Sequence, residues 1–241
     1  MARRKQDAVS EDARRDREQL LQHVQALLAR DAAAAADLDL KYFTRAFLRR
    51  VPDEELLPHT PEHLAALIAE QVAFLRQRST DETLVRVFNP ELARDGWSSP
   101  HTVLQVINPD RPFIVDTLNL VMAELGLSVH WLVHPVMHVE RDADGIATGF
   151  FSSREGRGAP ESIIHLQVDL QCEEAALNRL SDRVSEAMTH IRWAVEDWPE
   201  MLQRADEAVA ELTAWAPACD EELLAEAREF LHAHPGTEHS A

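Results

Sequence analysis

The chain has 241 residues, of which 45% are hydrophobic and 27% are charged, the usual balance of a globular protein with one or two domains and a substantial core. Its formal net charge is −18, which argues against a nucleic-acid-binding protein, because such proteins use lysine and arginine to neutralise phosphates. The pair Arg49–Arg50 is interpreted as solvated surface rather than as part of a basic stripe.

Targeting signals and cysteine motifs are absent from the sequence. No apolar run reaches the roughly 18 residues of a membrane-spanning helix, so we expect no membrane association. The basic residues 1–6 meet acidic residues without an apolar signal core, which predicts a cytoplasmic protein. Cys172 and Cys219 fit no metal-finger spacing and define no disulfide framework.

Residues 1–78 are predicted to form an N-terminal helical segment. Apolar residues recur at helical spacing in three successive stretches: 20–28, 40–47 and 64–75. The first helix could continue through the alanines of 32–36, and Pro52 ends the second after residue 51. Thr60 is placed to cap the third helix, with Pro61 at its first position.

The central part of the chain changes to a strand pattern. Strands are expected at 84–88, 101–107, 127–140 (bent at Pro135) and 164–170. The run 101–107 is apolar enough to be buried on both faces, whereas 164–170 alternates and predicts a half-buried strand. A helix with apolar residues from Ile114 to Leu125 lies between the second and third strands, and Gly126 is placed as its left-handed C-terminal residue.

The last part of the chain is again helical. Apolar residues from Leu177 to Trp198 step by three and four, which predicts a long helix that Pro199 breaks or kinks. Further helical stretches are expected to about Ala214 and over 220–231.

The order strand, helix, strand, strand, helix over 101–189 is that of a ferredoxin-like unit without its last strand. The first strand would then have a bare edge, which the upstream stretch 84–88 can cover by antiparallel pairing. We therefore expect an α+β fold with a permuted four-stranded sheet and two helices on one face. Either the N-terminal helices or a second copy of the chain would cover the other face. The predicted division is a helical segment to residue 78, an α+β domain at 79–198 and a helical extension at 199–241.

Several segments in this order resemble the N-terminal region of the large NAD-specific glutamate dehydrogenases of bacteria. They are Phe47-Leu-Arg-Arg-Val-Pro52, Val85-Arg-Val-Phe-Asn-Pro90, Asp95-Gly-Trp-Ser-Ser-Pro-His-Thr102, Pro112-Phe-Ile-Val-Asp116, Val133-His-Pro-Val136 and Val195-Glu-Asp-Trp-Pro199. The similarity extends from about residue 40 to residue 231, and 221–231 looks like the start of the next part of such enzymes.

The resemblance implies an ACT-type, ferredoxin-like module that regulates or oligomerises and is not itself a catalyst. The parent enzymes convert glutamate, NAD and water to 2-oxoglutarate, ammonia and NADH, so NAD would belong to the parent and no cofactor to this region. Implied partners are further copies of the chain, the catalytic domains of the parent, and an amino-acid effector. The alternative is a free-standing ACT-like protein that binds amino acids or dimerises.

A catalytic role for the chain itself would need a cradle for the pyrophosphate of NAD. The closest match, Gly156-Arg-Gly158, precedes a strand rather than the helix N-terminus that binds pyrophosphate, and we interpret it as a hairpin tip. No catalytic residue is assigned.

The candidate ligand site is the turn between the strand at 101–107 and the following helix. The resemblance implies an effector turn Asp-Arg-Pro-Gly, which Asp110-Arg111-Pro112 matches, except that Phe113 replaces the glycine. Asn108, Asp110, Arg111 and Phe113 are the candidate residues, with backbone amides and Arg111 facing a carboxylate. The simpler interpretation is a tight turn, capped by Asn108 or Asp110, with Phe113 in the core.

Metal sites are not expected. His130 and His134 would lie about 13 Å apart along a strand, too far to share one ion with His138. The pattern Asp142-x-Asp144-Gly145 lacks the glutamate of a calcium loop and is interpreted as a turn.

The tryptophans are potential core or contact residues. Trp131 and Trp198 are expected to be core or interface anchors. Trp97, between turn-forming residues, is expected at the surface.

Overall fold

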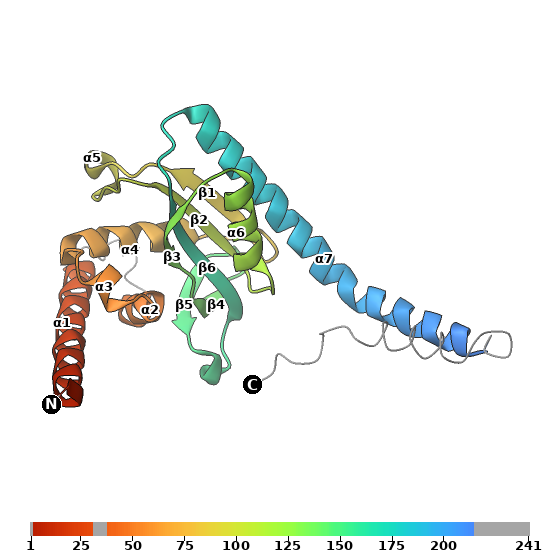
Figure 1. Cartoon of the computed structure of the whole chain (residues 1–241), viewed down its shortest axis with the longest axis horizontal. Coiled ribbons are helices and arrows are strands. Elements are labelled where there is room, and N and C mark those ends of the chain that lie inside the picture. Colours follow the sequence, from red (N-terminus) through yellow and green to blue (C-terminus); the bar gives the residue numbers. More distant parts are fainter. Residues whose placement is uncertain (1, 31–37, 215–241) are drawn as a thin grey trace. The chain divides into compact units, whose positions relative to one another are not determined.

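The computed structural model of the chain describes residues 2–30 and 38–214 (Figure 1). The helices are α1 (Ala2–Arg30), α2 (Leu40–Leu48), α3 (Asp53–Leu56), α4 (Pro61–Leu75), α5 (Leu92–Asp95), α6 (Ile114–Glu124), α7 (Glu174–Ala214) and the 3-10 turn η2 (Ser153–Glu155). The strands are β1 (Leu84–Phe88), β2 (Thr102–Pro109), β3 (Val129–Val133), β4 (Val136–Arg141), β5 (Ala147–Phe151) and β6 (Ala159–Val168). The α+β class expected from the sequence is confirmed.

Side-chain caps fix where the N-terminal helices begin. The carboxylate of Asp39 accepts a hydrogen bond of 2.9 Å from the amide of Tyr42 at the start of α2. The Thr60 hydroxyl accepts one of 3.2 Å from the amide of His63, and Pro61 follows as the first residue of α4, as predicted. Such caps satisfy amides that have no partner within the helix.

The upstream strand completes the sheet where the sequence placed it. β1 pairs antiparallel with β2, with Leu84 opposite Ile107 and Phe88 opposite Val103. β2 pairs with β6, whose other side pairs with β3 and then with β4, and β5 pairs with β4. β1 is therefore one edge of the sheet, and it covers the edge of β2 that would otherwise be bare.

The described residues contain a six-stranded sheet rather than the expected four-stranded one. The single bent strand expected at 127–140 is two strands, because Pro135 has no N–H for the ladder; its carbonyl instead accepts a hydrogen bond from Ile163. The turn at 142–145 is present, but it leads into β5, which the sequence pattern did not reveal.

Helices cover both faces of the sheet, so the central strands are buried on both sides. Residues of α1, α2 and α4 share one hydrophobic core with Val103, Ile107 and Ile163, which confirms the N-terminal helices as the cover of that face. On the other face lie α6 and residues 174–189 of α7 (Figure 1), and Leu104, Val106, Ile164 and Leu166 are buried without belonging to the core of the first face. The half-buried pattern expected for 164–170 was therefore wrong, because the helices of the first face bury its polar positions too.

A buried cluster of three charged side chains connects the end of α4 to the sheet. The Glu161 carboxylate on β6 lies 2.8 Å from Nη2 of Arg78 and 2.8 Å from Nε of Arg141, and its side chain is 1% exposed. Arg141 also donates to the carbonyl of Leu75. Burial opposes ionisation of Glu161, but the hydrogen bonds from Arg141 and Arg78 outweigh it and lower the pKa of the carboxyl.

Helix ends agree with the sequence in one case and differ in another. Gly126 adopts the expected left-handed conformation with φ 68°, and Leu127 donates to the carbonyl of Met122. By contrast, α7 continues through Pro199 to Ala214, so the proline does not end it. From His190 onward the helix belongs to a second compact unit.

The stretches predicted as helical at 32–36 and 220–231 lie outside the described residues. Among the helices that the structure describes, none is both long and apolar enough to cross a bilayer.

Candidate functional site

The turn between β2 and α6 is tied to its surroundings by the polar atoms of its own residues. Asn108 is 1% exposed, and its Oδ1 accepts hydrogen bonds from the Thr83 hydroxyl at 2.5 Å and from Arg111 at 3.3 Å. The amide of Asp110 donates to the carbonyl of Pro160 at 2.9 Å. Three of the four residues predicted for this site are therefore held in fixed positions at the end of β2.

Phe113 occupies the turn differently from what the sequence suggested. Its side chain is 68% exposed, so the expectation that it lies in the core was wrong. Its backbone is left-handed, with φ 69° and ψ 3°, the one such conformation at a described residue other than glycine. This conformation is what the glycine of the effector pattern would adopt freely, and a Cβ makes it costly. The ring consequently projects outward instead of filling the space beside the turn.

The residue that precedes α6, Phe113, provides neither a side-chain cap nor a core anchor, whereas Ile114, the first residue of the helix, is buried. No side chain of the described residues caps the helix at Phe113, although Asn108 and Asp110 were both considered for that role. The carboxylate of Asp110 is instead engaged by Ser162. The capping part of the simpler interpretation was therefore wrong, and Arg111 lies next to the uncapped helix start.

A chain of hydrogen bonds runs from the turn through β6 to His134. Asp110 Oδ1 accepts from the Ser162 hydroxyl at 2.6 Å, and the same hydroxyl oxygen lies 3.1 Å from Nε2 of His134. Because the single hydroxyl proton of Ser162 points to the carboxylate, Nε2 of His134 must donate. Burial lowers the pKa of His134; the charge of Asp110 raises this pKa and the charge of Arg50 lowers it further. The ring is therefore neutral, and with its proton on Nε2 it has its lone pair on Nδ1.

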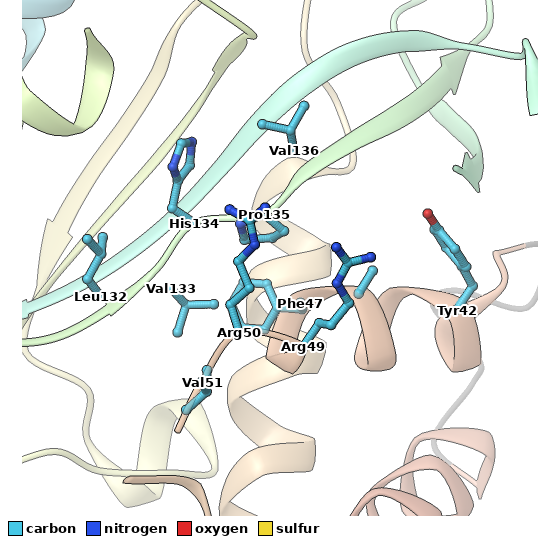
Figure 2. Close-up of a pocket in the computed structure, with 11 residues that line it drawn as sticks. Tyr42, Phe47, Arg49, Arg50, Val51, Leu132, Val133, His134, Pro135 and Val136 are labelled. Carbon is cyan, nitrogen blue, oxygen red and sulfur yellow. The ribbon is translucent and has the colours of Figure 1, made fainter. Parts of the chain in front are cut away.

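His134 also lines a pocket between the end of α2 and the connection of β3 to β4. The pocket has a cavity volume of about 200 Å³. Its lining residues are Tyr42, Ala46, Phe47, Arg49, Arg50, Val51, Leu132, Val133, His134, Pro135 and Val136. Figure 2 shows the Arg50 side chain extending from the end of α2 toward Pro135, and the Arg49 side chain lying between Arg50 and Tyr42.

Sequence reasoning missed this pocket. Arg49 and Arg50 are exposed, as the interpretation of solvated surface required, yet they form one wall of a concave surface. The opposite wall comes from residues 132–136, about 85 positions further along the chain. The one available signal was that Arg49–Arg50 and His134-Pro135 both lie in segments that carried the family resemblance.

Trp97 is buried, contrary to the expectation of a surface position. Its side chain is 1% exposed and lies among the rings of His63, Phe88 and His165, with centroid distances of 5.5, 6.3 and 5.9 Å. Gly96, left-handed at the end of α5, turns the chain so that the indole enters the core below α4. Trp131 is also buried, as expected of a core anchor.

The three histidines considered for metal binding have separate partners or positions. His130 lies 2.7 Å from Asp169, His134 binds Ser162, and His138 is on β4. Among the residues that the structure describes, no three His, Cys, Asp or Glu side chains form a group able to hold a metal ion. Asp142 accepts from the amides of Asp144 and Ile146, as a turn residue does.

The permuted sheet with helices on both faces, and the strand-to-helix turn beside it, define an ACT-type, ferredoxin-like domain. A family model described as "Glutamate dehydrogenase, ACT1 domain" matches residues 43–184, and the chain belongs to this family.

Two curated relatives carry the name NAD-specific glutamate dehydrogenase. The protein from Halomonas elongata is 33% identical over 226 residues, which is 92% of this chain and 14% of the relative. The protein from Pseudomonas aeruginosa is 28% identical over 210 residues, 86% of this chain and 13% of the relative. The chain thus spans only a small part of the length of these enzymes.

Proposed function

We propose that this chain is a non-catalytic regulatory and assembly region of a larger NAD-dependent glutamate dehydrogenase. The observation that carries the proposal is the family match over 43–184, which includes the whole sheet, in a chain that covers 14% of a relative named for that activity. The chemistry of glutamate oxidation and the binding of NAD would belong to other parts of such an enzyme. Its partners would be those parts and other copies of the same region.

The regulatory part of the proposal concerns the turn after β2. An amino-acid effector would place its carboxylate at the start of α6, where the helix dipole and uncapped amides favour an anion. Arg111 would contribute charge, and Asn108 and Asp110 would fix the turn through their contacts with Thr83 and Ser162. Phe113 would border the ligand from the solvent side, since its ring projects outward.

The test compares the isolated chain with the full-length enzyme that carries it. The purified chain, mixed with glutamate and NAD, should produce no NADH absorbance, whereas the full-length enzyme should produce it. Amino acids are then titrated into the full-length enzyme, and Arg111→Gln should lose any change in activity that they cause. NADH formation by the isolated chain would contradict the non-catalytic role, and an effector response unchanged by Arg111→Gln would contradict the assigned turn.

A further inference from the structure

We propose that the pocket between Arg49, Arg50 and His134 is a second ligand site, separate from the turn, that binds a small aliphatic dicarboxylate. The proposal concerns binding to this chain and does not depend on the regulatory function proposed above.

The first argument is the pair of cationic groups at the pocket. Among the described residues, neither Arg49 nor Arg50 has an ion pair or a hydrogen bond from its guanidinium group. This differs from Arg45, one turn earlier on the same helix, which pairs with Glu18, and from Arg17, which pairs with Asp53. A chain with net charge −18 has many carboxylates available. Two adjacent uncompensated guanidinium groups beside a cavity therefore suit a ligand that brings its own negative charges.

The second argument is the apolar lining of the pocket, which favours a ligand with a hydrocarbon chain between its charged groups. The apolar residues that line the pocket include Phe47, Val51, Val133, Pro135 and Val136. The Val136 side chain is 48% exposed, so its methyl groups are accessible to a ligand in the pocket. A ligand with methylene groups would cover these surfaces, whereas an inorganic anion would leave them wet.

The third argument is the size of the cavity, about 200 Å³. Pockets for drug-sized ligands occupy roughly 300–1,000 Å³, so this one accepts a smaller molecule. Two carboxylates joined by a short aliphatic chain match both the volume and the two arginines.

His134 and Tyr42 would act as neutral positioning groups. The Nε2–H of His134 is committed to Ser162, so the ring orientation is fixed from behind by β6. Tyr42 remains protonated, since burial, together with the charge of Glu155, raises the pKa of its hydroxyl. Its O–H can therefore donate to a carboxylate, while the positive charge of the site comes from the arginines.

The test uses glutarate as the probe, with isothermal titration of the full 241-residue chain at low salt. Glutarate should bind, and its affinity should fall at least tenfold in Arg49→Gln/Arg50→Gln. Arg179→Gln, an exposed arginine on α7, should bind as the unchanged protein does. Circular dichroism should show that all three proteins are equally folded. Absence of binding to the unchanged protein, or equal affinity in the double variant, would overturn the proposal.

Two further titrations separate the contribution of the ligand's charges from that of its hydrocarbon chain. Glutaramide, which has the same carbon chain without the charges, should not bind, and inorganic phosphate should bind more weakly than glutarate. Phosphate binding as tight as glutarate binding would overturn the dicarboxylate assignment.

Discussion

The Ser162 hydroxyl lies 2.6 Å from Oδ1 of Asp110, joining the central strand β6 to the turn that precedes α6. This bond determines the direction of the serine proton and thereby the tautomer of His134 on the other side. The turn and the arginine pocket are consequently connected by three side chains, although Asp110 and His134 are 24 positions apart in the sequence.

Replacing Ser162 with alanine should disconnect these groups. Because the buried Ser162 hydroxyl is lost together with its hydrogen bond to the Asp110 carboxylate, which is exposed and can be solvated instead, we expect a loss of about 0.5–1.5 kcal/mol in the free energy of unfolding, measured with urea. Nitrogen NMR shifts should show the Nε2–H form of His134 in the unchanged protein and a mixture of tautomers in the variant. Ser185→Ala, which removes an exposed hydroxyl from α7, should change neither quantity. A pure Nε2–H form in Ser162→Ala would contradict the assigned direction of the bonds.

Glu161→Gln should be among the most destabilising single substitutions in the chain. It would leave Arg78 and Arg141 buried without a countercharge, for which we expect a loss of about 3–5 kcal/mol in urea unfolding. The matched control is Glu140→Gln, which breaks an exposed pair with Arg157 and should cost less than about 1 kcal/mol. Similar losses in the two variants would show that the buried cluster has no special role.

Stability should depend on pH through His165. This side chain is completely buried, its Nδ1 has no hydrogen-bond partner in the described structure, and burial lowers its pKa from 6.5 to about 3. As the pH falls from 6.5 toward 3, the unfolded chain binds a proton that the folded chain does not, so stability decreases. His165→Leu should reduce the slope of unfolding free energy against pH by up to about 1.4 kcal/mol per unit. Equal slopes between pH 6.5 and 5 would disprove this origin.

Phe113→Gly should stabilise the protein although it removes an aromatic ring. The ring is mostly exposed, and glycine relieves the left-handed backbone, so we expect a gain of about 1 kcal/mol in thermal unfolding experiments. Phe113→Ala keeps the Cβ and should give no such gain. If alanine and glycine behave alike, the backbone conformation is not the source of the effect.

The arrangement of the strands was predictable because it follows from general rules about sheet edges. The antiparallel pairing of β1 with β2 was derived from a bare edge and a nearby strand pattern, and the register confirms it. β5 was not predictable in the same way, because its sequence Ala-Thr-Gly-Phe-Phe follows a turn and lacks a clear alternation. The strand is recruited by pairing with β4, a tertiary effect that local patterns do not contain.

The environment of single side chains was harder to predict than the fold. Trp97 is surrounded in sequence by turn formers, but the turn directs it inward, and only the packing of α4 over the sheet reveals this. Arg49 and Arg50 were correctly predicted to be exposed. The pocket beside them was not predicted, because its opposite wall comes from a distant segment of the chain. Predicting such a site requires the tertiary arrangement of α2 and the β3–β4 connection.

The way the helices α2 and α4 cover the sheet limits how the chain can be divided. A fragment that began at residue 79 would keep every strand but would uncover Val103, Ile107 and Ile163, and it would lose Arg78 from the ion cluster. Such a piece should aggregate through its stripped face. The smallest portion that can be expected to fold unaided therefore begins before α2, in agreement with a family match that already starts inside that helix at residue 43.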